Sequence, residues 1–176
     1  LPLDGSVFPD ANVTSWVTGG DASWFGQANV SLPGVLAAQS GSTTNNGDSW
    51  LQSVVNGPGI LTFWWKVSSE TNFDFLKFYI GTNEQSRISG EVDWQKQTFG
   101  LSPGPHTLLW HYSKDLDVSS GMDAGWVAQV SFAPASWLEV AAAQHNGGCT
   151  LILYGQTGKH YRVLVSTNLI NWDVLG

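Results

Sequence analysis

The chain has 176 residues and a formal net charge of −7, with 14 Asp and Glu residues against 7 Lys and Arg residues. This excess of negative charge disfavours nucleic acid and anionic membrane surfaces as partners, and the longest apolar stretches are too short for insertion into a membrane as a helix. Ten tryptophans beside 20 glycines, with only 12% charged residues, are typical of a tightly turned β protein.

Short runs with alternating apolar and polar residues, separated by Gly, Pro and Asn, predict strands along most of the chain. Residues 1–48 are rich in loops, with short strands expected near residues 13–17 and 35–39. Residues 49–55 and 60–68 predict two antiparallel strands joined by a tight connection at Asn56-Gly57-Pro58-Gly59. The remaining strands are expected at residues 73–81, 93–101, 105–114 and 126–133. Their spacing is that of an all-β sandwich.

The sequence pattern changes at Ala133-Pro134-Ala135, and this change predicts a domain boundary. Residues 1–134 are expected to form an antiparallel β-sandwich of the jelly-roll type. Residues 135–176 are too few for an ordinary hydrophobic core. They are expected to form either a short C-terminal β appendage or part of a truncated second β module.

Several segments carry a family resemblance. At residues 59–70 (GILTFWWKVSSE), at Asp93-Trp94-Gln95 and at Gly125-Trp126-Val127 the chain resembles the MAM-like and laminin-G-like (concanavalin-like) jelly-roll modules of secreted bacterial multidomain proteins. The resemblance covers roughly residues 24–132, and residues 138–176 resemble part of a second recurrent module. It implies a non-catalytic binding or adhesive unit that is secreted or lies on the cell surface, beside neighbouring domains of a larger chain. Relatives carry an Asp where this chain has Ala128, so a role of that acid in metal binding is not implied here.

Aromatic residues with amines and amides beside them predict a surface that stacks and hydrogen-bonds a sugar. If the strands at residues 60–67 and 73–81 belong to one sheet, alternation places their aromatic and lysine side chains on a shared outer face. Trp16, Trp24 and Trp94 lie near predicted turns, where they are candidates to line a rim at the edge of the sandwich. The alternative for any single Trp is packing in the core, which we expect for Trp50, Trp65, Trp110 and Trp126. The ligand-binding candidates are Trp94, Trp24, Trp64, Tyr79, Lys77, Gln95 and Asp93.

Three acidic residues, Asp115, Asp117 and Asp123, lie in a segment rich in Ser and Gly. Carboxylate and carbonyl oxygens of such a loop are suitable ligands for a structural Ca²⁺ ion, although the bidentate Glu of an EF-hand is lacking. The alternative is a solvated acidic turn. No cofactor is expected to be required.

The sequence contains no catalytic motif of a hydrolase and no metal-binding spacing of histidines. The leading function is therefore a non-catalytic carbohydrate-binding module that binds polysaccharide by aromatic stacking and polar side chains. The rival function is a structural or adhesive module that contacts neighbouring domains, subunits or cell surfaces without a glycan. An enzyme with a dispersed pair of carboxylates ranks behind both.

Overall fold

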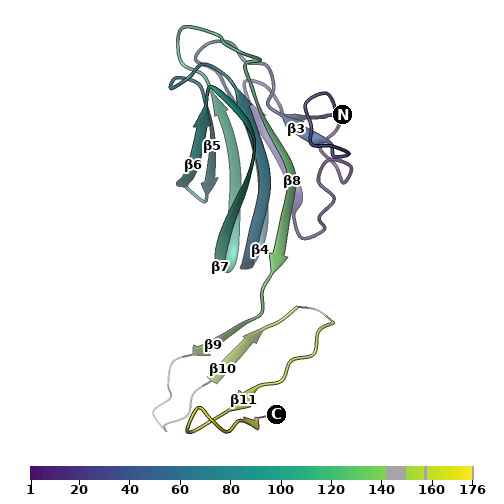
Figure 1. The fold of residues 1–176 in the computed structure, drawn as a ribbon, viewed down its shortest axis with the longest axis vertical. Coiled ribbons are helices and arrows are strands. Elements are labelled where there is room, and N and C mark those ends of the chain that lie inside the picture. The colour runs from purple at the N-terminus through teal and green to yellow at the C-terminus, as the bar shows by residue number, and fades with distance from the viewer. Residues whose placement is uncertain (142–149, 157, 176) are drawn as a thin grey trace. The chain divides into compact units, whose positions relative to one another are not determined.

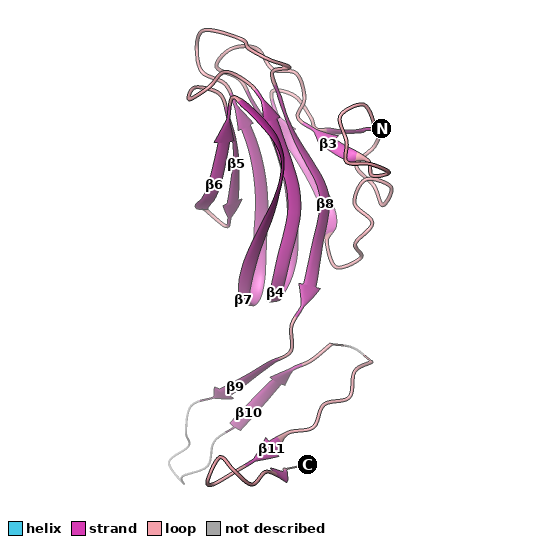
Figure 2. Cartoon of the chain, in the orientation of Figure 1, coloured by secondary structure: helices cyan, strands magenta, loops and turns pink. Residues whose placement is uncertain are grey.

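The computed structural model describes residues 1–141, 150–156 and 158–175. The chain divides into two units, Leu1–Pro134 and Ala135–Gly176. Within the described residues it consists of strands and loops without a helix (Figure 2). This confirms the predicted all-β class. None of the described residues forms a helix with the length and apolar character needed to cross a membrane.

The first unit is built from one antiparallel sheet of eight strands. Their order is β2-β3-β8-β4-β7-β5-β6, and β1 pairs with β4. The strands are β1 (Thr14–Gly20), β2 (Phe25–Gln27), β3 (Ala37–Gln39), β4 (Asp48–Ser68), β5 (Phe75–Ile80), β6 (Asn83–Ser89), β7 (Glu91–Ser113) and β8 (Ala124–Pro134).

The two long strands β4 and β7 run through both layers of the sandwich. They pair with each other from Asp48↔Ser113 to Ser68↔Glu91, with a register shift after Gly57. The ring of Phe63, from the second half of β4, lies 5.1 Å from the ring of Trp110, from the second half of β7, measured between centroids. Because these residues are far from each other along the β4–β7 ladder, the sheet must fold over between them and return as a second layer (Figure 1).

We call the two layers layer 1 and layer 2. Layer 1 contains β1, residues 48–56 of β4, residues 105–113 of β7, β5 and β6. Layer 2 contains β2, β3, β8, residues 59–68 of β4 and residues 91–101 of β7. The hairpin predicted around Gly57 and Pro58 is therefore wrong: each of its two runs pairs with β7, in different layers, and they do not pair with each other.

The core lies between the layers and is rich in aromatic rings. Trp65 and Trp110 are fully buried in it, as expected, and Phe63 contacts both rings edge-on. Trp126 is also fully buried, but it lies outside this core cluster, and its indole N–H donates to Gln39. Truncating a large buried ring of this kind costs about 3–5 kcal/mol, so these aromatics account for much of the stability.

The second unit contains two separate two-stranded sheets in the part that the structure describes. One pairs β9 (Trp137–Ala141) with β10 (Thr150–Tyr154), and the other pairs β11 (Leu164–Val165) with β12 (Asp173–Val174). The register Leu138↔Leu153 and Val140↔Leu151 places four aliphatic residues on one face of the β9–β10 hairpin. All four are exposed.

Candidate functional site

The outer face of layer 2 carries the most suggestive group of side chains. Phe63 and Trp65 point into the core, so alternation along β4 directs Trp64 and Lys66 outward. Trp64 is half-buried and lies directly opposite Lys96 of β7. Opposite residues of an antiparallel pair share a face, so the exposed Lys96 side chain lies beside Trp64.

A β-bulge adds two further side chains to this face. Trp65 pairs with Gln95 and Val67 pairs with Val92, so Asp93 and Trp94 together lie opposite the single residue Lys66. Trp94 is half-buried. We call the surface formed by Trp64, Lys66, Asp93, Trp94 and Lys96 the Trp64 face.

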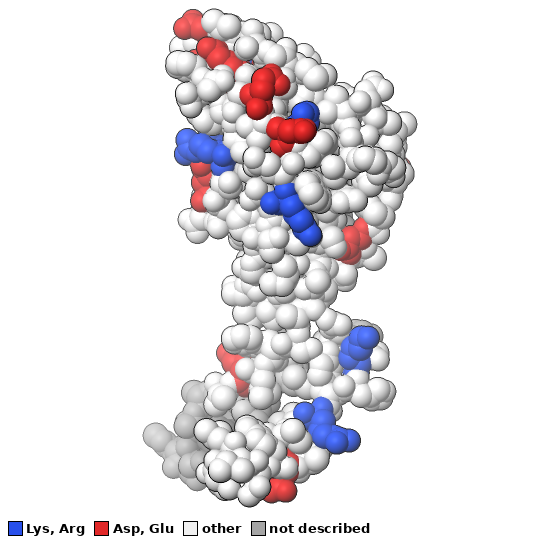
Figure 3. All heavy atoms as spheres, in the orientation of Figure 1, with Lys and Arg blue, Asp and Glu red and all other residues white. Residues whose placement is uncertain are grey.

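The charges of the Trp64 face are arranged as one ion pair and one separate amine. Lys66 Nζ donates to Asp93 Oδ1 at 3.0 Å, and the Asp93 side chain is 87% exposed. The hydrogen bond from Lys66 holds the pKa of Asp93 below its usual value. Lys96 belongs to no ion pair among the described residues. Figure 3 shows a few charged atoms over β4 and β7 within a mostly uncharged surface.

Three of the predicted ligand-binding residues, Trp64, Trp94 and Asp93, thus lie together. Lys96 completes the group, although it was not among the ligand-binding residues predicted from the sequence. Its position opposite Trp64 depends on the β4–β7 register, and the sequence alone does not reveal that register.

The prediction for Trp24 is wrong. Its side chain is only 3% exposed and belongs to the core. The backbone N–H of Trp24 donates to Thr18 Oγ1 at 2.7 Å. This hydrogen bond links the segment after β1 back to β1, and the Trp24 ring packs in the core. A ring in this position does not line an exposed rim.

The predicted residues Lys77 and Tyr79 lie on the outer face of layer 1, because β5 pairs with the second half of β7. The expectation that they share a face with Trp64 is therefore wrong. The Lys77 ammonium lies 5.5 Å from the ring centroid of Phe75, and the Tyr79 hydroxyl donates to Glu84 at 3.3 Å. Gln95 lies opposite the buried Trp65, so by alternation it belongs to the inner face, at the exposed edge of layer 2.

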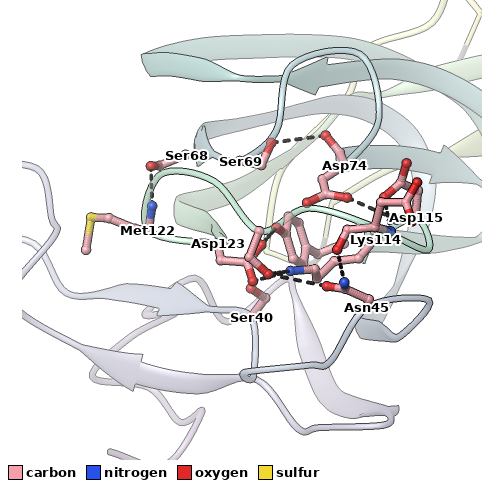
Figure 4. Close-up of polar contacts among 12 residues, drawn as sticks. Ser40, Asn45, Ser68, Ser69, Asp74, Lys114, Asp115, Met122 and Asp123 are labelled. Carbon is pink, nitrogen blue, oxygen red and sulfur yellow. Dashed lines mark hydrogen bonds and ion pairs between the residues drawn. The ribbon is translucent and has the colours of Figure 1, made fainter.

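The predicted metal residues occupy the loop between β7 and β8, and they separate into two groups. Asp123 binds the Lys114 ammonium and accepts a hydrogen bond from the Tyr112 hydroxyl at 3.0 Å (Figure 4). Burial, followed by the nearby Asp123 charge, raises the pKa of Tyr112 well above its ordinary value. Because Lys114 already neutralises Asp123, this carboxylate is not available to a metal ion.

Asp115 instead lies beside acidic residues of another loop. One carboxylate oxygen each from Glu70, Asp74 and Asp115 lie within 4.8 Å of one another. Asp117 is exposed and outside this group, and its backbone N–H donates to Asp115 Oδ1 at 3.1 Å. The grouping of Asp115 with Asp117 and Asp123 as ligands of one ion is therefore wrong, and only Asp115 remains a candidate.

Neither a protein-family model nor a curated protein sequence matches the chain. Among solved structures, the secreted serine protease VesC from Vibrio cholerae aligns with 70% of this chain and 25% of its own, at a TM-score of 0.58 and 18% identity. The K1 cleaved adhesin domain of Lys-gingipain from Porphyromonas gingivalis W83 aligns with 70% of this chain and 94% of its own, at a TM-score of 0.52 and 15% identity. TmCBM61 in complex with beta-1,4-galactotriose aligns with 76% of this chain and 97% of its own, at a TM-score of 0.49 and 15% identity.

These likenesses concern the fold. The chain has the β-sandwich architecture found in the adhesin domain and in part of VesC, and its structural neighbours include β-sandwich carbohydrate-binding modules. The aligned region spans only a quarter of VesC. The more specific resemblance to MAM-like and laminin-G-like modules stays a prediction.

Proposed function

We propose that the chain is a non-catalytic carbohydrate-binding module of a secreted or cell-surface protein, and that it binds polysaccharide on the Trp64 face. The observation that carries this proposal is the β-bulge, which sets Trp94 and Asp93 beside Lys66 and near Trp64 on an outward-facing surface. β-Bulges are frequent next to functional sites because they re-aim side chains out of the regular pleat. The β-sandwich neighbours are compatible with this function.

The chemistry of the Trp64 face suits a sugar. Indole rings offer flat apolar surfaces for the C–H side of a pyranose, and each aromatic contact contributes on the order of 1 kcal/mol beyond area burial. Asp93 accepts hydrogen bonds from hydroxyl groups, while Lys66 and Lys96 donate them. Because two ring contacts alone fall short of the roughly −4 to −8 kcal/mol of millimolar to micromolar binding, the polar groups must contribute as well.

The experiment is affinity gel electrophoresis with a panel of soluble neutral polysaccharides, followed by titration calorimetry with any glycan that retards the protein. We expect Trp94→Ala and Trp64→Ala each to weaken binding about tenfold, which corresponds to about 1.4 kcal/mol. The melting temperature should stay close to that of the wild type, because neither ring is buried in the core.

The matched control is Tyr79→Ala, which removes an aromatic ring of similar exposure from the outer face of layer 1. It should leave binding unchanged. A loss of binding in Tyr79→Ala with retention in Trp94→Ala would move the site to layer 1. If no glycan of the panel retards the wild type, the carbohydrate function is refuted.

The rival function, a structural or adhesive module, rests on a different observation. Leu138, Val140, Leu151 and Leu153 form an exposed aliphatic face in the second unit, and such a face favours contact with another protein surface. This function predicts concentration-dependent self-association in sedimentation experiments, with a weaker effect after Leu151→Ser. A monomer at all concentrations, together with glycan binding, would decide for the carbohydrate function.

A further inference from the structure

Two loops at one end of the sandwich bring three carboxylates together. Glu70 and Asp74 belong to the loop between β4 and β5, and Asp115 follows β7 at the start of the loop that leads to β8. One carboxylate oxygen from each residue lies within 4.8 Å of the others. Figure 4 shows the Asp74 side chain beside Asp115, linked by the hydrogen bond that the Asp115 backbone N–H donates to Asp74 Oδ1 at 3.0 Å.

Asp74 is the decisive member of this cluster. Its side chain is completely buried, and its Oδ2 has no hydrogen-bond partner. Oε2 of Glu70 is also buried without a partner. A buried carboxylate oxygen without a donor is costly, by about 1–3 kcal/mol or more for a charged group. Asp74 and Glu70 each contribute such an oxygen to the same acidic cluster, which favours a positively charged group bound beside them.

Among the described residues, no basic side chain forms an ion pair with this cluster. Lys114 is the adjacent base, but its ammonium is committed to Asp123 and to Ser119 Oγ. None of the three carboxylates takes part in an ion pair among the described residues. Burial and the neighbouring acidic charges raise the pKa of both Glu70 and Asp74, and the nearby charge of Lys114 offsets this only in part.

The donor atoms define the class of cation. All three ligands are carboxylate oxygens, which hard divalent cations prefer, whereas transition metals favour His and Cys. Ca²⁺ accepts six to eight oxygen ligands in a flexible geometry, whereas Mg²⁺ demands a near-ideal octahedron and keeps several of its waters. Three carboxylates contributed by two separate loops suit the more tolerant Ca²⁺. Backbone carbonyls of the two loops and water are suitable further ligands for the flexible coordination of Ca²⁺.

We propose that Glu70, Asp74 and Asp115 bind one Ca²⁺ ion that joins the β4–β5 loop to the β7–β8 loop. The ion neutralises Asp74 in the interior and fixes the two loops to each other. This centre replaces the predicted grouping of Asp115 with Asp117 and Asp123. It is independent of the glycan function, because none of its residues belongs to the Trp64 face.

The test is the thermal stability of the full chain after treatment with EDTA and dialysis. CaCl₂ should raise the melting temperature of the wild type by about 3 °C or more once Ca²⁺ exceeds its dissociation constant a hundredfold. MgCl₂ and NaCl at equal ionic strength should have a much smaller effect. Titration calorimetry with CaCl₂ should give a stoichiometry of one.

Asp74→Asn is the informative variant, because the amide keeps the size and one acceptor oxygen but removes the charge. We expect this variant to show no rise in melting temperature with CaCl₂. Its metal-free form should melt at or above the temperature of the metal-free wild type, because a repulsive charge has been removed. Glu70→Gln, at a less buried position, should also abolish the response and serves if Asp74→Asn does not fold. The control Asp117→Asn should respond like the wild type. Equal Ca²⁺ responses in the wild type and Glu70→Gln, a response to Mg²⁺ alone, or no response in the wild type would each overturn the proposal.

Discussion

Asp10 links the loop before β1 to strand β8 through its carboxylate. Oδ2 accepts hydrogen bonds from Ser131 Oγ at 2.7 Å and from the Phe132 backbone N–H at 2.8 Å. Oδ1 accepts two from Asn12, one from its backbone N–H at 2.8 Å and one from its side-chain amide at 3.1 Å. Partial burial raises the pKa of Asp10, but the hydrogen bonds outweigh this effect and hold the pKa below its usual value of 3.8. The charged form therefore stabilises the fold above about pH 3.8, and this contribution is lost as the pH falls through the lowered pKa.

We expect Asp10→Asn to reduce the free energy of unfolding by about 1.5–3 kcal/mol at pH 7, the range for hydrogen bonds to charged groups. The reduction should become smaller toward pH 2, because the wild-type carboxyl gains its proton as the pH falls through its lowered pKa. Urea denaturation of both proteins at the two pH values measures the difference. An equal reduction at both pH values would contradict the role of the charge.

At the scale of single residues, the sequence pattern predicted whether a side chain points outward. It did not predict which other residues lie beside that side chain in space. Alternation along residues 60–67 correctly separated Trp64 from Trp65. It could not show that Tyr79 belongs to the other layer, because that depends on pairing with β7. Likewise Asp115 meets Glu70, a residue from a distant loop, through the folding of the whole sheet.

The fold-over of β4 depends on two glycines that have no room for a side chain. A Cβ atom at Gly57 would lie 2.1 Å from the carbonyl oxygen of Ser102, and one at Gly59 would lie 2.4 Å from Cζ of Phe132. Gly100, on the neighbouring stretch of β7, has no atom within 4 Å of the same position. Gly57 and Gly59 are thus required by close approach, whereas Gly100 is not.

We expect Gly57→Ala to lower the free energy of unfolding by about 1–3 kcal/mol, because the backbone of Ser102 must shift. Gly100→Ala should change it by no more than about 0.5 kcal/mol. Chemical denaturation midpoints of the two variants give the comparison. Similar values for both would show that the fold-over tolerates a side chain at Gly57.

The strand ranges of the sandwich were predictable because buried strands alternate strongly. β6 was missed because its sequence NEQSRIS carries almost no apolar alternation, as is typical of an exposed edge strand. The glycine- and proline-containing connection at residues 56–59 was recognised as a change of direction. The pairing of the runs on either side of it with β7 was not predicted. Local sequence does not distinguish a hairpin from a strand that crosses between two layers.

At the scale of the whole molecule, the charge distribution limits the class of glycan. The first unit contains 12 acidic and 5 basic residues, and one of these bases, Lys114, is buried in an ion pair. We expect polyanionic glycans such as polygalacturonate to be excluded at about 0.15 M salt, where long-range repulsion acts over about 8 Å. Affinity gels with neutral and polyanionic polysaccharides of similar length provide the measurement. Strong retention of the protein by the polyanion, reversed by high salt, would contradict this expectation.

The passage of β4 and β7 through both layers also governs how the chain reaches its native state. The ladder contacts Asp48↔Ser113 and Gly59↔Pro134 join partners that are remote in the sequence. Long loops must close before either contact forms. The conformational entropy lost in closing them is offset only by the contacts made when both layers assemble. We expect such a topology to fold slowly compared with a helical bundle of the same size, because its ladder contacts join residues that are remote in the sequence.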